Sequence, residues 1–209
     1  MPKVLIITFF LCVPIALSAQ KKFGVYFQGT SSTAKIINPQ SHENSIFIYS
    51  NREGFGAGAS LDFRINQRLS LSYRVGYTQK GFVGATRTNE IGETIPIGSS
   101  TIHFVGLDQI MKVWVKPEKV YFLAGISNAR MVANDLPSEF ENPSAGSSMI
   151  KRDDYHDWSF GGLVGIGYDY DGTLYFEGGL NFDISPSLET SDALIRNNFL
   201  YANIGFRLF

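Results

Sequence analysis

The sequence predicts an all-β protein, an eight-stranded antiparallel up-and-down transmembrane β-barrel with short periplasmic turns and four long extracellular loops. Three observations support this prediction. An apolar segment near the N-terminus has the layout of a secretory signal peptide. Long stretches alternate apolar and polar residues with a period of two. The connections between these stretches are alternately short and long.

Residues 1–19 are expected to be the signal peptide, and residues 20–209 a single outer-membrane β-barrel domain. The apolar run 4–17 follows a positively charged start, and small residues precede the expected cleavage after Ala19. The run is too short for a spanning helix, although a retained membrane anchor is the alternative. The only cysteine, Cys12, lies inside this run, so the mature chain would have neither disulfides nor thiol chemistry.

The composition restricts the class of function. The formal net charge is -1, so no basic excess favours nucleic acid as a partner. Glycine (21 residues) and aromatic residues (14%) are abundant, whereas charged residues make up only 18%. This balance fits a soluble all-β fold or a membrane barrel, and the pattern of residues must decide between them.

The alternation is clearest in residues 54–65, where every second residue from Phe55 to Ile65 is apolar and the residues between them are small or polar. It resumes after Asn66 and Gln67, which predicts a β-hairpin. Similar patterns recur along the chain, and no stretch has a helical period. The predicted strands are residues 22–31, 54–65, 68–80, 101–115, 119–131, 157–170, 173–184 and 197–209.

The connections distinguish the two ends of the barrel. The connections after strands two, four and six are short turns, whereas those after strands one, three, five and seven are long. This asymmetry is typical of outer-membrane barrels and predicts periplasmic termini and outward-facing loops. The predicted long loops are residues 32–53, 81–100, 132–156 and 185–196.

The two faces of the strands differ in a way that favours a membrane barrel. The apolar face carries almost no charge, as lipid contact requires, and the polar face is mostly small residues that suit a narrow lumen. A soluble lipocalin-like carrier with inverted faces is the alternative. Aromatic residues near strand ends are expected to form the interfacial girdles: Tyr77, Phe82, Trp158, Phe160, Tyr168, Tyr170, Phe199 and Tyr201.

The polar face also carries isolated charges. Because eight strands leave room for side chains rather than a wide channel, we expect these charges to pair inside the barrel and to stabilise it. A narrow or gated ion path is the alternative. The expected members of this network are Asp62, Arg64, Arg74, Lys112, Glu177 and Arg207, with further single charges at Asp108 and Asp183.

The candidates for chemistry are few. His42, His103 and His156 have positions that do not suggest a catalytic triad. Residues 153–157 (DDYHD) could bind a divalent cation, but a solvated loop is the simpler interpretation. Residues 169–172 resemble a calcium loop only superficially, and a turn explains them. We therefore predict no catalytic, cofactor-binding or metal-binding residue, no cofactor, and no enzyme.

Several segments are similar to those of the porin-like outer-membrane β-barrel domain family, the group often called PorT-like. Residues 77–81 (YTQKG) are the most specific part of the resemblance. Members often carry a proline in the fourth strand, where this chain has Leu107, Asp108 and Gln109. The resemblance implies an eight-stranded barrel in the outer membrane and no single activity. The matching segments are residues 54–58, 69–82, 121–126, 160–167 and 204–209.

These observations predict an integral outer-membrane protein of a Gram-negative cell with a structural, interaction or ligand-binding role exerted through its extracellular loops. A narrow channel or a rim-site enzyme acting on lipid or peptide is the alternative. The expected partners are outer-membrane lipid, lipopolysaccharide, and an unknown protein at the loops. The barrel-assembly machinery is a further expected partner, because the last strand ends on the aromatic Phe209.

Overall fold

The computed structural model describes residues 20–37, 48–88, 94–117, 119–135, 157–185, 188–189 and 194–208. No helix in these ranges is long and apolar enough to cross a membrane. The predicted signal peptide, residues 1–19, and the C-terminal Phe209 lie outside them. The strands are β1 (Gln20–Ile37), β2 (Ile48–Arg64), β3 (Leu69–Thr88), β4 (Thr94–Lys116), β5 (Val120–Asp135), β6 (Trp158–Asp169), β7 (Leu174–Asp183), β8 (Leu188–Glu189) and β9 (Leu194–Arg207).

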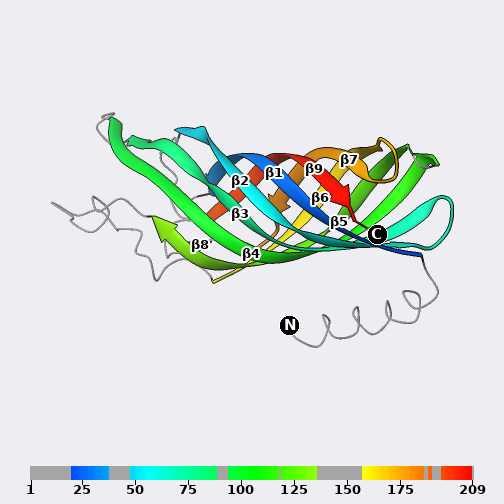
Figure 1. The fold of residues 1–209 in the computed structure, drawn as a ribbon. Coiled ribbons are helices and arrows are strands. Elements are labelled where there is room, and N and C mark those ends of the chain that lie inside the picture. The colour runs from blue at the N-terminus through cyan, green and yellow to red at the C-terminus, as the bar shows by residue number, and fades with distance from the viewer. Residues whose placement is uncertain are drawn as a thin grey trace.

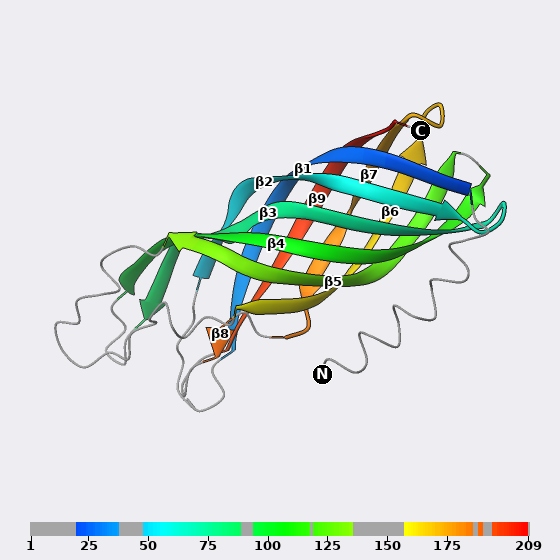
Figure 2. The ribbon, with the colours of Figure 1, turned by 60° about the horizontal axis from the view of Figure 1, so that its bottom comes forward.

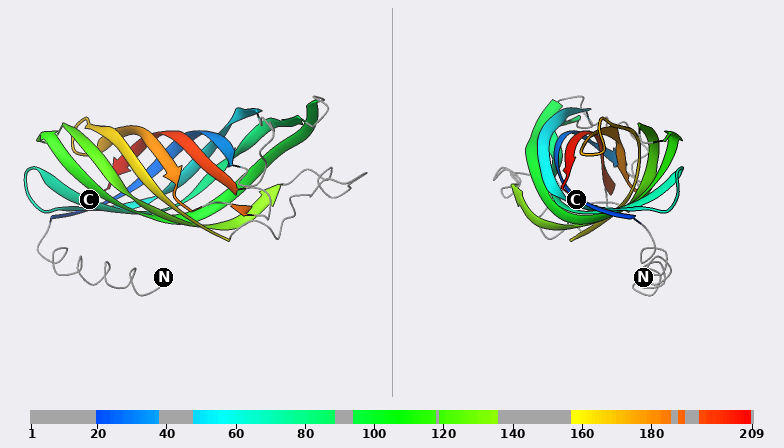
Figure 3. Two further views of the ribbon diagram at one scale, coloured as in Figure 1. Left: turned by 180° about the vertical axis from the view of Figure 1, so that it is seen from behind. Right: turned by 45° about the vertical axis from the view of Figure 1, so that its right-hand side comes forward.

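Eight of these strands form a closed barrel. Each strand from β1 to β7 pairs antiparallel with the next one along the chain, β7 pairs with β9, and β9 pairs back with β1. The two-residue strand β8 pairs only with the extracellular end of β9. Figures 1 and 2 show the tilted wall of strands, and Figure 3 shows it surrounding a central axis. The predicted up-and-down topology is confirmed.

The register of the barrel is sheared by ten residues. The strand pairs can be followed once around the wall from Asp183 on β7, through Ser127, Arg74 and Arg207. The path returns at Thr173, which directly precedes β7 and lies ten residues before Asp183. A shear of this size in an eight-stranded barrel requires strands tilted by roughly 35–45° from the axis. The tilt brings side chains that are far apart in sequence to the same height in the lumen.

The short turns are stabilised by local side chains. The Asn66 side-chain oxygen accepts hydrogen bonds from the backbone N–H groups of Arg68 and Leu69 in the turn between β2 and β3. Between β6 and β7, the Asp171 carboxylate accepts from Thr173 and Leu174. The N–H of Leu174, and then that of Thr173, hold the pKa of the exposed Asp171 carboxyl below its ordinary value.

The backbone completes this turn. Gly172 has a φ of 84°, which favours glycine, and its N–H donates to the Asp169 carboxylate. The interpretation of residues 169–172 as a turn is confirmed.

The strands are longer at the extracellular end than predicted. Large parts of the expected loops 32–53 and 81–100 belong to β1, β2, β3 and β4. A membrane strand needs only about 9–11 residues, whereas β3 has 20 residues and β4 has 23. Beyond the bilayer neither face contacts lipid, so the apolar and polar alternation fades although the backbone pairing continues. For this reason the sequence pattern placed the strand ends too early.

The inside and outside of the barrel follow the predicted alternation. Large apolar side chains point outward and are exposed on all eight wall strands, including Phe27, Phe55, Val113 and Phe122. Trp158, Phe160, Tyr168 and Tyr170 also lie on this outer surface, as the girdle prediction requires. The prediction is wrong for Phe199 and Tyr201, which are buried in the lumen. Both residues occupy positions of β9 whose side chains point into the lumen. Their aromatic rings therefore fill space between small lumen residues rather than contacting lipid.

Candidate functional site in the barrel lumen

A layer of charged and aromatic side chains crosses the lumen. Every one of the eight wall strands contributes to it, and its members are buried. The layer therefore joins strands that do not pair with one another through the backbone. In strand order its members are Tyr26, Asp62, Arg74, Lys112, Tyr121, Asp169, Glu177 and Arg207.

Glu177 lies at the centre of the layer. One oxygen of its fully buried carboxylate accepts a hydrogen bond from the Arg74 guanidinium. The other oxygen accepts from the Tyr121 hydroxyl at 2.6 Å and lies 3.3 Å from the Lys112 ammonium. Asn203 adds a longer amide hydrogen bond of 3.4 Å. One carboxylate thus connects β3, β4, β5 and β9 to β7.

Asp62 and Arg207 extend the network toward the periplasmic end. The Asp62 carboxylate lies 3.2 Å from the Lys112 ammonium and 3.0 Å from the Arg207 Nε. The Arg207 guanidinium also pairs with Asp169, the residue whose other oxygen holds the turn before β7. Within this layer three positive groups face three carboxylates, so the layer is neutral. Such complete pairing is what a buried ionic network needs in order to stabilise a fold.

The predicted charge network is therefore confirmed with one change. Arg64 lies at the periplasmic rim, where its guanidinium donates to the carbonyls of Asn66 and Gln67 and covers the Trp114 ring at 5.0 Å. Its place in the network is taken by Asp169, which was predicted at the end of the strand 157–170 and in the turn 169–172 but not as a member of the network. The alternation along β6 places Asp169 on the face that points into the lumen, and this was the signal that could have identified it.

Lumen tyrosines pack against glycines of neighbouring strands. A Cβ atom at Gly167 would overlap the ring of Tyr121, and one at Gly205 would overlap the ring of Tyr175. Tyr26 lies in the same way over Gly76. The narrow lumen accepts these rings only where a neighbouring strand has no side chain, which explains the many glycines on the inward face.

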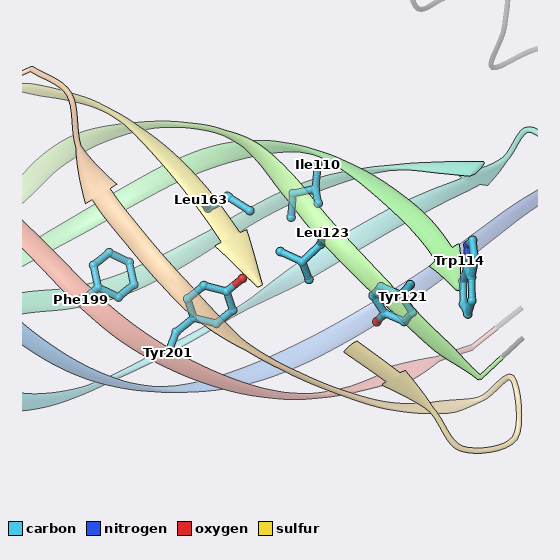
Figure 4. Packing of buried hydrophobic residues seen from close by; sticks show 7 residues of the cluster. All are labelled: Ile110, Trp114, Tyr121, Leu123, Leu163, Phe199 and Tyr201. Carbon is cyan, nitrogen blue, oxygen red and sulfur yellow. The ribbon is translucent and has the colours of Figure 1, made fainter. Parts of the chain in front are cut away.

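Apolar side chains fill much of the remaining lumen. Figure 4 shows Trp114 beside Tyr121, with Phe199 and Tyr201 at the other end of the cluster. The centroids of the Trp114 and Tyr121 rings are 4.6 Å apart, and the Trp114 indole N–H donates to Ser70. Both the ionic layer and these rings occupy the space through which a solute would have to pass. The cluster consists of Ile110, Trp114, Tyr121, Leu123, Leu163, Phe199 and Tyr201.

A second ion pair lies closer to the extracellular end. The Lys80 ammonium lies 3.3 Å from the Asp183 carboxylate, which also accepts from Ser159 at 3.0 Å. The ammonium is within 5 Å of the ring centroids of Phe104 and Phe199. Between this pair and the central layer lies a small polar cavity of about 40 Å³.

The other sequence candidates do not meet at a site. His42, His156 and residues 153–156 lie outside the described residues. His103 is on the outer face of β4, where its Nδ1 is 2.5 Å from the Tyr77 hydroxyl. Its Nε2 is 3.7 Å from the Asp135 carboxylate. Asp157 is exposed, and only its backbone carbonyl takes part in a described contact, with the Met131 N–H. Among the described residues there is no group of three or more His, Cys, Asp or Glu placed to hold a metal ion.

A comparison of the whole sequence with models of protein families identifies the family of this chain. The model of the outer membrane protein beta-barrel domain matches residues 4–207. The chain belongs to this family. This outer-membrane β-barrel protein is therefore located in the outer membrane, as the signal segment and loop asymmetry predicted. No protein with a curated description matches the sequence.

Solved structures show the same fold. Neisserial surface protein A is 16% identical, with 89% of this chain and 97% of that chain covered and a TM-score of 0.50. OprG from Pseudomonas aeruginosa is 10% identical, with 91% and 97% covered and a TM-score of 0.52. At these identities the similarity establishes a shared eight-stranded architecture and nothing about a shared ligand.

Proposed function

We propose that this outer-membrane β-barrel protein is a closed, non-enzymatic membrane anchor that binds a partner or an external ligand at its extracellular end. The observation that carries the proposal is the ionic layer, to which all eight wall strands contribute. Buried pairs of this kind hold the strands together and fill the lumen at the level of the layer. A lumen built in this way supports anchoring better than transport.

The strand lengths support the extracellular part of the proposal. β6 and β7 have 12 and 10 residues, close to the length that a bilayer requires, whereas β3 and β4 run well beyond it. In Figures 1 and 2 the ends of β3 and β4 project at the end of the barrel opposite the C-terminus. A rigid paired sheet outside the membrane can present loops to a partner at low entropic cost. Outer-membrane lipid and lipopolysaccharide would contact the apolar outer face of the barrel below this sheet.

Two measurements test the proposal. In planar bilayers the refolded protein should give no discrete conductance steps, and regular openings would instead support the narrow channel. In intact cells, a photocrosslinking residue at the exposed Val132 of β5 should form one identifiable adduct. The control is a variant in which the photocrosslinking residue replaces Asp171, in the turn at the opposite end of the barrel. An adduct that forms only at Asp171, or none at Val132, would contradict binding at the extracellular end.

A further inference from the structure

The cavity between the ionic layer and the Lys80–Asp183 ion pair has the properties of a small binding site. Its volume is about 40 Å³. A buried water needs roughly 10–15 Å³, so the cavity has room for about three waters or for a single ion with one or two waters. Arg74 and Tyr26 bound it on the periplasmic side, and Lys80 and Phe104 on the extracellular side.

Asp108 is the one lumen carboxylate that takes no part in the described ion pairs. It faces the cavity from β4, directly opposite Arg74 in the register of β3. The guanidinium of Arg74 pairs with Glu177, and the ammonium of Lys80 pairs with Asp183. Asp108 interacts with both positive groups only at longer range and hydrogen-bonds Ser127.

Counted over the described ion pairs of the lumen together with Asp108, the charges leave one negative charge. The positive groups of the ionic layer are Arg74, Lys112 and Arg207, and Lys80 is the positive group of the second ion pair. The carboxylates paired with them are Asp62, Asp169, Glu177 and Asp183, so the described ion pairs are neutral. Asp108 adds a charge of -1 that these pairs do not compensate. A buried charge without a counter-ion is costly, so the cavity favours a species that carries one positive charge.

The neutral groups lining the cavity are rich in oxygen acceptors. Oδ1 of Asn203, Oδ1 of Asn181 and the hydroxyl of Tyr201 are buried and have no hydrogen-bond partner among the described residues. The amide nitrogen of Asn203 donates to Glu177 at 3.4 Å, which directs its oxygen away from that carboxylate. Among the described residues, Nε of Arg74 is a buried donor on the same lining without a partner, and the Tyr201 hydroxyl can donate as well as accept. Oxygen atoms of this kind are ligands for hard cations.

We propose that this cavity is a binding site for one monovalent metal cation of the Na⁺ or K⁺ class, with the Asp108 carboxylate as its charged ligand. Oxygens of Asn203, Asn181 and Tyr201 and one or two waters complete the coordination. A divalent cation is disfavoured because the cavity offers one unpaired carboxylate, whereas Ca²⁺ sites use several. An anion would raise the uncompensated charge from -1 to -2.

The test compares cations during folding of the full barrel. The protein is refolded into neutral phosphatidylcholine vesicles in NaCl, KCl or choline chloride at one ionic strength. The thermal midpoint is then followed by the heat-modifiable gel shift. Choline is too large for the cavity. We expect Na⁺ or K⁺ to raise the midpoint with saturation, by about 3–6 °C when its concentration is ten times its Kd.

Three variants locate the effect. Asp108→Asn removes the charged ligand and should abolish the cation dependence. Asp171→Asn is the matched control in the exposed turn and should keep the full dependence. Tyr201→Phe removes a hydroxyl that has no hydrogen-bond partner among the described residues. This variant should fold normally and raise the half-saturating cation concentration about three- to tenfold. It also keeps the proposal testable if Asp108→Asn does not fold.

Equal midpoints in all three salts would overturn the proposal, as would an undiminished cation effect in Asp108→Asn or Tyr201→Phe. A midpoint that depends on pH near neutrality but not on the cation would assign the compensating charge to a proton on Asp108, and would overturn the proposal equally. These outcomes leave the proposed anchoring function untouched, since a barrel with or without an internal cation can remain closed.

Discussion

Glu177 is the residue on which the ionic layer most depends, and replacing it with glutamine tests that dependence. The substitution keeps the size of the side chain and removes the charge that faces Arg74 and Lys112. Removing one partner of a buried pair costs about 3–5 kcal/mol because the remaining charge is left uncompensated. The retained amide oxygen can still accept one hydrogen bond from Tyr121 or Arg74, which offsets about 1 kcal/mol.

The expected loss in the free energy of unfolding is therefore about 2–4 kcal/mol. With a urea m-value of about 2 kcal/mol/M, the midpoint of unfolding should fall by about 1–2 M. The assay is urea unfolding of the barrel in phospholipid vesicles, read by the mobility of unheated samples on a gel. The slope of the transition should not change, because the substitution leaves the buried surface nearly constant.

A control variant and a double-mutant cycle separate this effect from a general loss of charge. Glu53→Gln removes an exposed carboxylate on β2 and should change stability by less than about 0.5 kcal/mol. Arg74→Met combined with Glu177→Gln should be less destabilising than the sum of the single changes, with a coupling of about 1–3 kcal/mol. A loss for Glu177→Gln as small as that for Glu53→Gln would refute the reasoning. Strict additivity in the cycle would refute the direct pairing of Arg74 with Glu177.

Further predictions concern the walls of the barrel. Gly205→Ala should lower the free energy of unfolding by about 1–3 kcal/mol, because the new Cβ would overlap the Tyr175 ring. Gly29→Ala, where the same atom would meet nothing within 4 Å, should change it by less than about 0.5 kcal/mol in the same urea titration. Val164→Arg places a charge on the exposed outer face in the middle of β6 and should cost about 2–4 kcal/mol in vesicles. Val132→Arg, at the extracellular end of β5, should cost only about 0–1 kcal/mol, and equal losses for the two arginines would argue against the assigned position of the bilayer.

The sequence by itself determined the class of the fold and the direction of most strand residues. Period-two alternation is a local property, because side chains of successive residues point to opposite faces of a strand. From it the outward Phe55 and Phe122 and the inward Asp62 and Lys112 could all be assigned. The short turns at residues 66–67 and 171–172 were equally local, since Asn, Asp and Gly stabilise them through contacts a few residues away.

Only the tertiary structure decided which charges meet and where the cavity lies. Arg74 and Glu177 are separated by 103 residues and Arg207 and Asp62 by 145, and nothing in the local pattern connects them. Their contacts depend on closure of the sheet and on its shear of ten residues, which together fix the height of each side chain in the lumen. The same closure leaves Asp108 outside the described pairs and places it on the cavity. The extent of β3 and β4 beyond the membrane was likewise decided by backbone pairing. Outside the bilayer one face of a strand no longer contacts lipid, so the alternation of apolar and polar residues ends there although the pairing continues.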